Sequence, residues 1–301
     1  MPDGRASGCR GGRTANPRGR LATPAHSARE FGAQLATRNR CASGRSPGPT
    51  WVATPAHSAR EFAPQLATRP DQAPPPPAGY PEDMTDFTTR GLLFDCDGVL
   101  ADSHDSAALA WNEWALTWAP SFDFHRDIVH GRRMGDSVAE LVAPEVFTEA
   151  ESDLVAAELR TAARVLAMPG AVDLLATLPA GSWAVVTSAL RPLATARISA
   201  AGLRFPELLV TADDVTGGKP LPEPYLRGAE ALGLAPADCT VFEDAPAGIQ
   251  SALAAGVGTV VGIGTAALGY GADAVVPDLR AVAFADGVLR VDDSARLDLG
   301  R

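Results

Sequence analysis

The chain has 301 residues, of which 46% are hydrophobic and 21% charged, and its formal net charge is −10. This length suffices for one large domain or two small ones. No apolar run approaches the roughly 18 residues of a membrane span, and the acidic balance of the C-terminal two thirds argues against nucleic-acid binding. We therefore expect neither a membrane nor a nucleic acid as a partner.

Residues 1–83 differ in composition from the rest of the chain. They carry 11 arginines and 6 acidic residues, whereas residues 84–301 carry 15 basic and 30 acidic residues. The sequence from Ala22 to Phe31 recurs from Ala53 to Phe62, and a run of prolines follows at 74–77. Two repeats without an apolar periodicity cannot bury a core, so we expect no folded domain here.

Three interpretations of residues 1–83 compete. The segment is a disordered basic tail, an arginine-rich transit peptide, or upstream sequence translated from a start codon placed too early. We favour the last, because Met84 leads almost directly into the first strand that we predict. We assign this segment no catalytic role.

The first predicted strand ends in two aspartates. An apolar run at 92–94 is followed by Asp95, Cys96, Asp97 and Gly98, which is typical of a buried strand of a parallel sheet and the turn after it. Ligands of open parallel sheets bind beyond the carboxyl ends of the strands. Two carboxylates this close repel each other unless a cation lies between them, and Mg²⁺ with its oxygen ligands is the simplest candidate.

Strand and helix patterns then alternate from residue 90 to the C-terminus, which predicts an α/β fold with a doubly wound, Rossmann-like parallel sheet. The further strands are expected at 183–186, 208–210, 240–242, 258–263 and 273–276. Two of them end in polar groups, Thr187-Ser188 after the strand at 183–186 and Glu243-Asp244 after the strand at 240–242. With Asp95 and Asp97, the second acidic pair completes a set of oxygen ligands for Mg²⁺, although Asp244 could instead be a helix N-cap.

Lys219 is the only lysine, although arginine occurs 25 times. It lies between Gly217-Gly218 and Pro220, in a predicted turn before a helix. A compact ammonium neutralises a phosphoryl oxygen or a carboxylate in a tight site better than a planar guanidinium does. We therefore expect Lys219 to belong to the same site.

These motifs, in this order and spacing, resemble those of the haloacid dehalogenase-like hydrolase superfamily. The resemblance covers residues 90 to about 280 and is closest to its sugar phosphatase and β-phosphoglucomutase-like subfamily, through the sequences 218–225 and 242–249. It implies a Mg²⁺-dependent phosphatase, a phosphoric monoester hydrolase, acting on a small phosphorylated sugar or polyol. The four cysteines show no metal-ligand spacing and suit a reducing cytoplasm, where we expect the protein to reside.

The resemblance also implies a role for each site residue. Asp95 would attack phosphorus and form an aspartyl-phosphate, and Asp97 would act as general acid and then general base. Mg²⁺ would be held by Asp95, the backbone carbonyl of Asp97, Asp244 and Glu243. The remaining phosphoryl oxygens would be bound by Thr187, Ser188 and Lys219.

Residues 104–168 are too long for a simple crossover, and the resemblance implies that they form a small helical cap inserted after the first strand. The catalytic core would then comprise residues 84–103 and 169–301. Three tryptophans at 111, 114 and 118 share one helical face, which we expect to be the cap's own core. A loop that begins with His130-Gly131 resembles one that faces the active site in similar phosphatases, so Arg132 and Arg133 are candidate substrate ligands.

Two other functions are alternatives to a phosphatase. Phosphosugar mutases of the β-phosphoglucomutase type carry a histidine where this chain has Ala107, and His104 lies three residues earlier, so we favour hydrolysis. A non-catalytic binding module that retains the fold is disfavoured by the intact set of Asp95, Asp97, Lys219 and Asp244.

Overall fold

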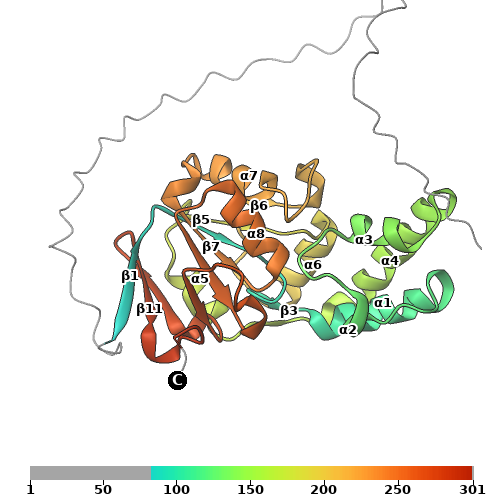
Figure 1. The fold of residues 1–301 in the computed structure, drawn as a ribbon, viewed down its shortest axis with the longest axis horizontal. Helices are drawn as coiled ribbons and strands as arrows, with labels where there is room; N and C mark the ends of the chain where they lie inside the picture. Colours follow the sequence, from blue (N-terminus) through green and yellow to red (C-terminus); the bar gives the residue numbers. More distant parts are fainter. Residues whose placement is uncertain (1–82, 300–301) are drawn as a thin grey trace, which may run out of the picture. The chain divides into compact units, whose positions relative to one another are not determined.

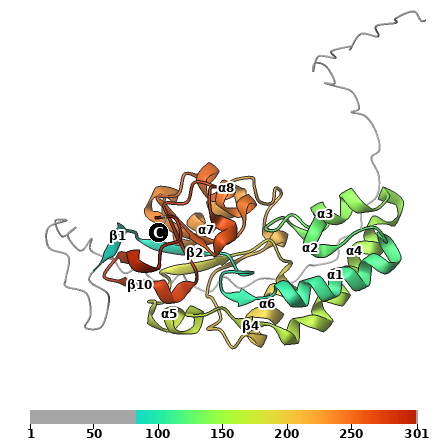
Figure 2. The same ribbon diagram turned by 60° about the horizontal axis from the view of Figure 1, so that its bottom comes forward.

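The computed structural model describes residues 83–299 of the chain. Of the segment 1–83, for which we predicted disorder or a misplaced start codon, residues 1–82 lie outside the described residues. The described residues form a sheet flanked by helices at one end and a group of helices at the other (Figures 1 and 2).

A six-stranded parallel sheet is the centre of the fold, in the strand order β6-β5-β2-β7-β8-β9. Its strands are β2 (Gly91–Phe94), β5 (Trp183–Val186), β6 (Leu209–Val210), β7 (Cys239–Glu243), β8 (Thr259–Ile263) and β9 (Ala274–Val276). Each is a short apolar run without alternation, as expected where helices cover both faces of a sheet. The predicted α/β class and doubly wound parallel sheet are confirmed.

Helices cover both faces of this sheet (Figure 2). On one face Leu93 packs with buried residues of α7 (Glu223–Leu232) and α8 (Pro246–Ala255). On the other, Leu92 and Phe94 pack with residues of α5 (Ala171–Thr177) and α6 (Arg191–Ala200). Because side chains alternate across a strand, three consecutive apolar residues of β2 serve both layers.

A second sheet, which the sequence patterns did not predict, lies beside the first. It is antiparallel, in the order β1-β11-β10, and joins both ends of the described chain. Its strands are β1 (Met84–Thr88), β10 (Val282–Ala285) and β11 (Val288–Asp292). Strand β1 thus begins at Met84 itself.

The first four α-helices of the described residues form a separate group, which we call the helical segment. It comprises α1 (His104–Trp118), α2 (Phe124–Asp127), α3 (Met134–Leu141) and α4 (Phe147–Thr161). Its entry and exit, β3 (Ala101–Asp102) and β4 (Leu166–Ala167), pair antiparallel, so both connections lie side by side. Figure 1 shows the segment beside the end of the sheet rather than on either face.

The helical segment has its own apolar core. Trp111 and Trp114 are buried there with Leu154, and the same cluster includes Leu193 of α6. The Trp114 indole N–H also donates to the Ala150 carbonyl at 2.7 Å. The tryptophan stripe of α1 therefore packs inside the segment, and α6 connects the segment to the rest of the fold.

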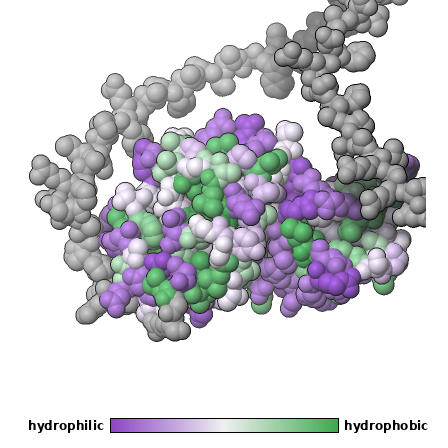
Figure 3. All heavy atoms as spheres, in the orientation of Figure 1, coloured by the Kyte–Doolittle hydropathy of each residue, from purple (hydrophilic) through white to green (hydrophobic). Residues whose placement is uncertain are grey.

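Among residues 83–299, no helix is both long enough and apolar enough to cross a membrane. On the face shown in Figure 3, hydrophobic residues are interspersed with hydrophilic ones. A mixed surface of this kind is ordinary for a folded domain.

Candidate active site

Three neighbouring strands of the parallel sheet end in polar residues, and their ends meet. Strand β2 lies between β5 and β7, so Asp95 follows the central strand, Thr187 follows β5, and β7 ends in Glu243 before Asp244. Phe94 and Phe242 are partners in the register of β2 and β7, and their rings stack 4.5 Å apart just below these ends. The topology thus brings together residues that are separated by up to about 150 positions in the sequence.

Lys219 lies at the centre of this group. Its Nζ atom is 2.7 Å from Asp95 Oδ1, 2.6 Å from Glu243 Oε1 and 3.2 Å from the Val186 carbonyl oxygen. The side chain is fully buried. Burial alone would lower the pKa of Lys219, but the Asp95 and Glu243 carboxylates outweigh it and raise the pKa, so the ammonium stays charged.

The site holds more carboxylates than its one lysine can neutralise. Oxygen atoms of Asp95, Glu243 and Asp244 lie within 4.8 Å of one another. Burial raises the pKa of Asp95 to about 7, with Glu243 and Asp97 adding to the rise and Lys219 opposing it. Burial, followed by Glu243 and Asp95, likewise raises the pKa of Asp244 well above its ordinary value. A hard divalent cation fits this set of buried oxygen donors, because it would offset their excess negative charge.

Glu243 differs from the two aspartates in its contacts. Its Oε1 atom accepts hydrogen bonds from Lys219 and from the Tyr225 hydroxyl, the latter at 2.6 Å. Its Oε2 atom accepts from the Ala245 backbone N–H at 3.3 Å. Both oxygens of Glu243 are thus already bonded to the chain. We infer that Asp95 and Asp244 are the stronger candidates for direct metal contact, with Glu243 holding Lys219 in place.

Two glycines allow the backbone to approach these carboxylates. Gly98 has φ = +81°, in the left-handed region that favours glycine, and a side chain there would overlap Asp244. This agrees with the sharp turn predicted after Asp97. Gly248, in α8, faces the Glu243 carboxylate so closely that an added Cβ would overlap it.

Gly248→Ala is expected to destabilise the protein by about 1–3 kcal/mol, because the methyl group must displace a fully buried carboxylate from its lysine. Gly135→Ala is the matched control, since in α3 the added Cβ would meet the flexible end of the Glu151 side chain. The measurement is urea unfolding of both variants followed by circular dichroism. Equal midpoints for the two variants would show that the Glu243 carboxylate has room to move.

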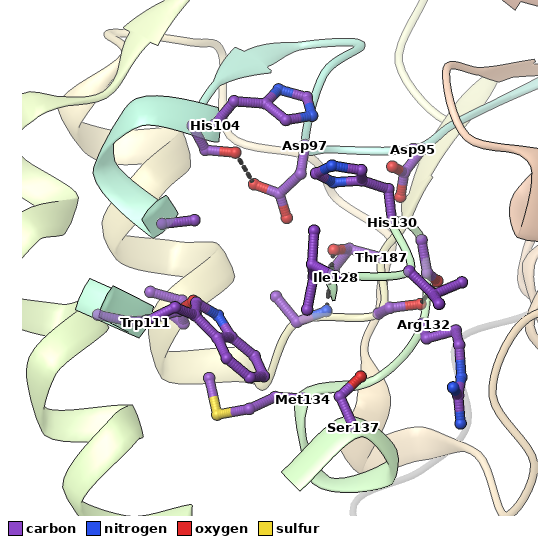
Figure 4. A pocket seen from close by; sticks show the side chains of 18 of the residues that line it. Asp95, Asp97, His104, Trp111, Ile128, His130, Arg132, Met134, Ser137 and Thr187 are labelled. Carbon is purple, nitrogen blue, oxygen red and sulfur yellow. Dashed lines mark hydrogen bonds between the residues drawn. The ribbon is translucent and has the colours of Figure 1, made fainter. Parts of the chain in front are cut away.

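Asp97 lines a cavity and points into it (Figure 4). Its Oδ1 atom accepts from the Ser103 hydroxyl at 2.6 Å, and its Oδ2 atom accepts from Arg197 at 2.9 Å. The Asp97 side chain is 28% exposed, against 6% for Asp95. The two aspartates of the first motif therefore differ in environment, one buried against the lysine and the other open to the cavity.

The cavity lies between the strand ends and the helical segment and has a volume of about 110 Å³. Asp95, Asp97, Thr187 and Asp244 line its floor, and residues of α1 and of the loop before α3 line the opposite side. The Ser188 hydroxyl donates to the Gly131 carbonyl at 2.7 Å, which ties that loop to the end of β5. The polar strand ends thus face one small cavity.

The two candidate arginines have different positions. Arg132 lines the cavity, but its guanidinium pairs with Glu140 at 2.6 Å. In Figure 4 the Arg132 side chain points away from Asp95. Arg133 pairs with Asp136 and donates to the Thr216 carbonyl at 2.9 Å, so it connects the helical segment to the loop before Lys219. Neither guanidinium donates to a residue of the strand ends in the part of the chain that the structure describes.

Two histidines lie side by side in the cavity lining. The His104 and His130 rings lie 4.9 Å apart, and His104 Nε2 is 3.8 Å from Asp244 Oδ2. Burial, with His104 adding to it, lowers the pKa of His130, which favours its neutral form. His130 thus faces the site as the resemblance implied.

A family model described as haloacid dehalogenase-like hydrolase matches residues 89–256, more than half of the chain. The chain belongs to the haloacid dehalogenase-like hydrolase family. The family predicted from the four motifs is therefore confirmed. The match ends directly after α8 and includes every residue that we assigned to the site from the sequence.

Curated relatives and solved structures extend this likeness. The chain is 41% identical to hexitol phosphatase A of Escherichia coli over 172 residues, which is 56% of this chain and 80% of that relative. It is 37% identical to glycerol-1-phosphate phosphohydrolase 2 of Saccharomyces cerevisiae over 190 residues, 58% of this chain and 75% of that one. A crystal structure of a hydrolase from Pseudomonas syringae matches with a TM-score of 0.55 at 29% identity, covering 63% of this chain and 93% of the other.

Proposed function

We propose that this hydrolase is a Mg²⁺-dependent phosphatase that hydrolyses small sugar or polyol phosphates through an aspartyl-phosphate on Asp95. The observation that carries the proposal is the arrangement at the strand ends, where Asp95 and Asp244 lie beside the buried Lys219 and Asp97 faces a small cavity. The similarity to proteins named as a hexitol phosphatase and a glycerol-1-phosphate phosphohydrolase supports the class of reaction and of substrate.

The chain's own residues divide the reaction into two displacements. Asp95 has one oxygen bound by Lys219, and its second oxygen attacks phosphorus while the bond to the leaving alkoxide breaks. Asp97 gives a proton to that alkoxide, and then takes a proton from the water that hydrolyses the aspartyl-phosphate. Asp95 is released as a carboxylate, together with inorganic phosphate.

The remaining phosphoryl oxygens meet positive or hydrogen-bonding groups. Lys219 supplies a fixed charge, and Thr187 and the Ser188 backbone lie at the end of β5, beside Asp95. Mg²⁺ would neutralise charge between the nucleophile and the phosphate. It would be held by Asp95, Asp244 and the backbone carbonyl of Asp97, with Glu243 as a further ligand. Each group acts where negative charge builds up.

We propose that the helical segment is the cap of this site and that its cavity-lining residues contact the substrate's alcohol. The two connections of this segment, β3 and β4, pair antiparallel, so the segment could move about them as about a hinge. Strand β3 lies next to Asp97 in sequence and pairs with it. The small cavity suits a sugar or polyol phosphate better than a macromolecular one.

Hydrolysis is proposed over mutase chemistry because Ala107 lies in the cavity lining, at the position where those mutases carry a histidine. Without a titratable group there, water is the expected acceptor of the phosphoryl group. Product analysis separates the two, since a phosphatase releases inorganic phosphate whereas a mutase releases an isomeric sugar phosphate.

The full-length protein is expected to release inorganic phosphate from glycerol phosphates or hexitol phosphates when Mg²⁺ is supplied in excess over the protein. Chelation with EDTA is expected to abolish release, and added Mg²⁺ to restore it. Mg²⁺ is also expected to raise the unfolding temperature, because it binds only the folded arrangement of carboxylates. A panel of sugar and polyol phosphates with no Mg²⁺-dependent release of phosphate would refute the proposal.

A further inference from the structure

A buried charged network connects the helical segment to Asp97. Arg197, in α6, donates through Nη1 to Asp97 Oδ2 at 2.9 Å and through Nη2 to Glu158 Oε2 at 3.0 Å. Glu158, in α4, accepts a further hydrogen bond at its Oε1 atom from the Trp111 indole N–H at 2.7 Å. Arg197 and Glu158 are only 5% and 4% exposed. The contacts run from α1 through α4 and α6 to the first motif.

Stability alone is a weak reason for such a network. Burying a guanidinium and a carboxylate costs desolvation that their attraction often only balances, and a hydrophobic replacement is frequently as stable. Burial also raises the pKa of Glu158 despite the opposing Arg197 charge. The Arg197 Nε atom has no hydrogen-bond partner among the described residues. The two outer nitrogens of the guanidinium therefore bind the two carboxylates. Asp97 belongs to the first motif and Glu158 to the helical segment.

The network determines the direction of the Asp97 carboxylate. Ser103 binds one of its oxygens and Arg197 the other, so rotation of the carboxyl group would break at least one of these bonds. Arg197 itself is fixed by Glu158, and Glu158 by Trp111, which lines the cavity. Three consecutive hydrogen bonds thus connect Trp111 of α1 to Asp97, and two of them connect Glu158 of α4 to Asp97.

We propose that Arg197 is a positioning residue that aims Asp97 at the leaving group and makes this aim depend on the position of the helical segment through Glu158. The inference rests on the proposed function, since it assigns Arg197 a role in the acid–base step of that reaction. Arg197 acts through Asp97 and need not contact the substrate itself.

The test compares two phosphate esters in the full-length protein. An alkyl phosphate such as glycerol phosphate needs a proton on its leaving oxygen, whereas 4-nitrophenyl phosphate releases a stable phenolate and does not. In Arg197→Lys the ammonium cannot bridge both carboxylates as the planar guanidinium does. We expect kcat/KM for the alkyl ester to fall about 100-fold, and that for the aryl ester by less than about threefold, because misaligned acid catalysis affects only the former.

A second variant guards against loss of folding. Arg197→Met alone would leave Glu158 buried without its cation, so Arg197→Met is combined with Glu158→Gln, which keeps an acceptor for Trp111. The matched control is Arg191→Lys, at the start of the same helix, where Arg191 pairs with Asp214 outside the cavity lining. We expect the double variant to unfold cooperatively and to show the ester-selective loss, and the control to keep the wild-type ratio.

A double-mutant cycle separates positioning from a structural role. In an Asp97→Asn background, Arg197→Lys is expected to change the ratio of kcat/KM for the alkyl ester to that for the aryl ester by less than about twofold. The carboxyl group that Arg197 positions is then absent. An equal loss for both esters, an unchanged ratio in the folded double variant, or an undiminished Arg197 effect without Asp97 would each overturn the inference. Absence of Mg²⁺-dependent hydrolysis of either ester by the wild type would instead refute the proposed function.

Discussion

Asp95→Asn is expected to lower kcat for phosphate release by about 10⁴-fold or more, the scale seen when a nucleophile is removed from an enzyme. The amide has no anionic oxygen for attack on phosphorus. It should nevertheless fold, because burial already raises the pKa of Asp95 to about 7 and a neutral group costs less to bury there. Steady-state phosphate release and thermal unfolding, measured on the same preparation, check both parts.

The sign of the stability change follows from that pKa. A carboxylate whose pKa is raised on folding stabilises the protein while it is protonated, and this contribution disappears as the pH rises through the folded-state pKa of about 7. Without Mg²⁺ at pH 8, the Asn variant should therefore unfold at an equal or higher temperature than the wild type. Asp105→Asn, the same change at an exposed residue of α1, is the control for both measurements. Wild-type turnover in Asp95→Asn would exclude Asp95 as the nucleophile.

Local sequence identified the strand-end residues because parallel sheets impose a simple geometry. Three short apolar runs each ended in polar groups, and strands that run in the same direction bring such ends to one edge. Asp95, Thr187 and Glu243 meet there as expected. Lys219 was identified by composition instead, since a single lysine among many arginines stands out whatever the fold.

Arg197 and Glu158 gave no comparable signal. Arg197 is one of 25 arginines and lies in an ordinary amphipathic helix, and its partners Asp97 and Glu158 are 100 and 39 positions away. Tyr225 is similar, because its bond to Glu243 depends on how α7 packs against the sheet. Side-chain pairing across elements is decided by tertiary packing, which periodicity does not encode. The antiparallel sheet was missed for a related reason, since β1 pairs with β11 across 208 residues from Met84 to Asp292.

Arg132 and Arg133 show the limit of motif resemblance. Their loop does border the cavity, yet each guanidinium pairs with an acidic residue of α3, Glu140 or Asp136. A resemblance in sequence indicates where a loop lies, whereas the direction of a long side chain depends on the nearest opposite charge. Their role as substrate ligands stays a prediction.

Lys219→Met is expected to reduce both stability and turnover. Its ammonium bonds Asp95, Glu243 and the Val186 carbonyl, so its removal leaves the two buried carboxylates of Asp95 and Glu243 without their cation. Breaking a buried pair in this way costs about 3–5 kcal/mol. Turnover should fall as well, because a fixed positive group beside the phosphoryl oxygens is lost. We expect kcat to fall by about 10²–10³-fold, as it does when one oxyanion-hole donor is removed from an enzyme. Urea unfolding without metal and phosphate release with Mg²⁺ measure the two effects.

The double variant Lys219→Met with Glu243→Gln separates the two roles. It removes one buried carboxylate along with the ammonium, and the Gln side-chain oxygen can still accept from Tyr225, so most of the lost stability should return. Turnover should stay low, because no cation then faces the phosphate. All three N–H groups of Lys219 already bond the chain, so direct donation to phosphate requires the ammonium to leave its longest partner, Val186, at 3.2 Å. If turnover recovered with stability, Lys219 would act only by neutralising Glu243 and Asp95, and the phosphate would be bound by the end of β5 and the metal alone.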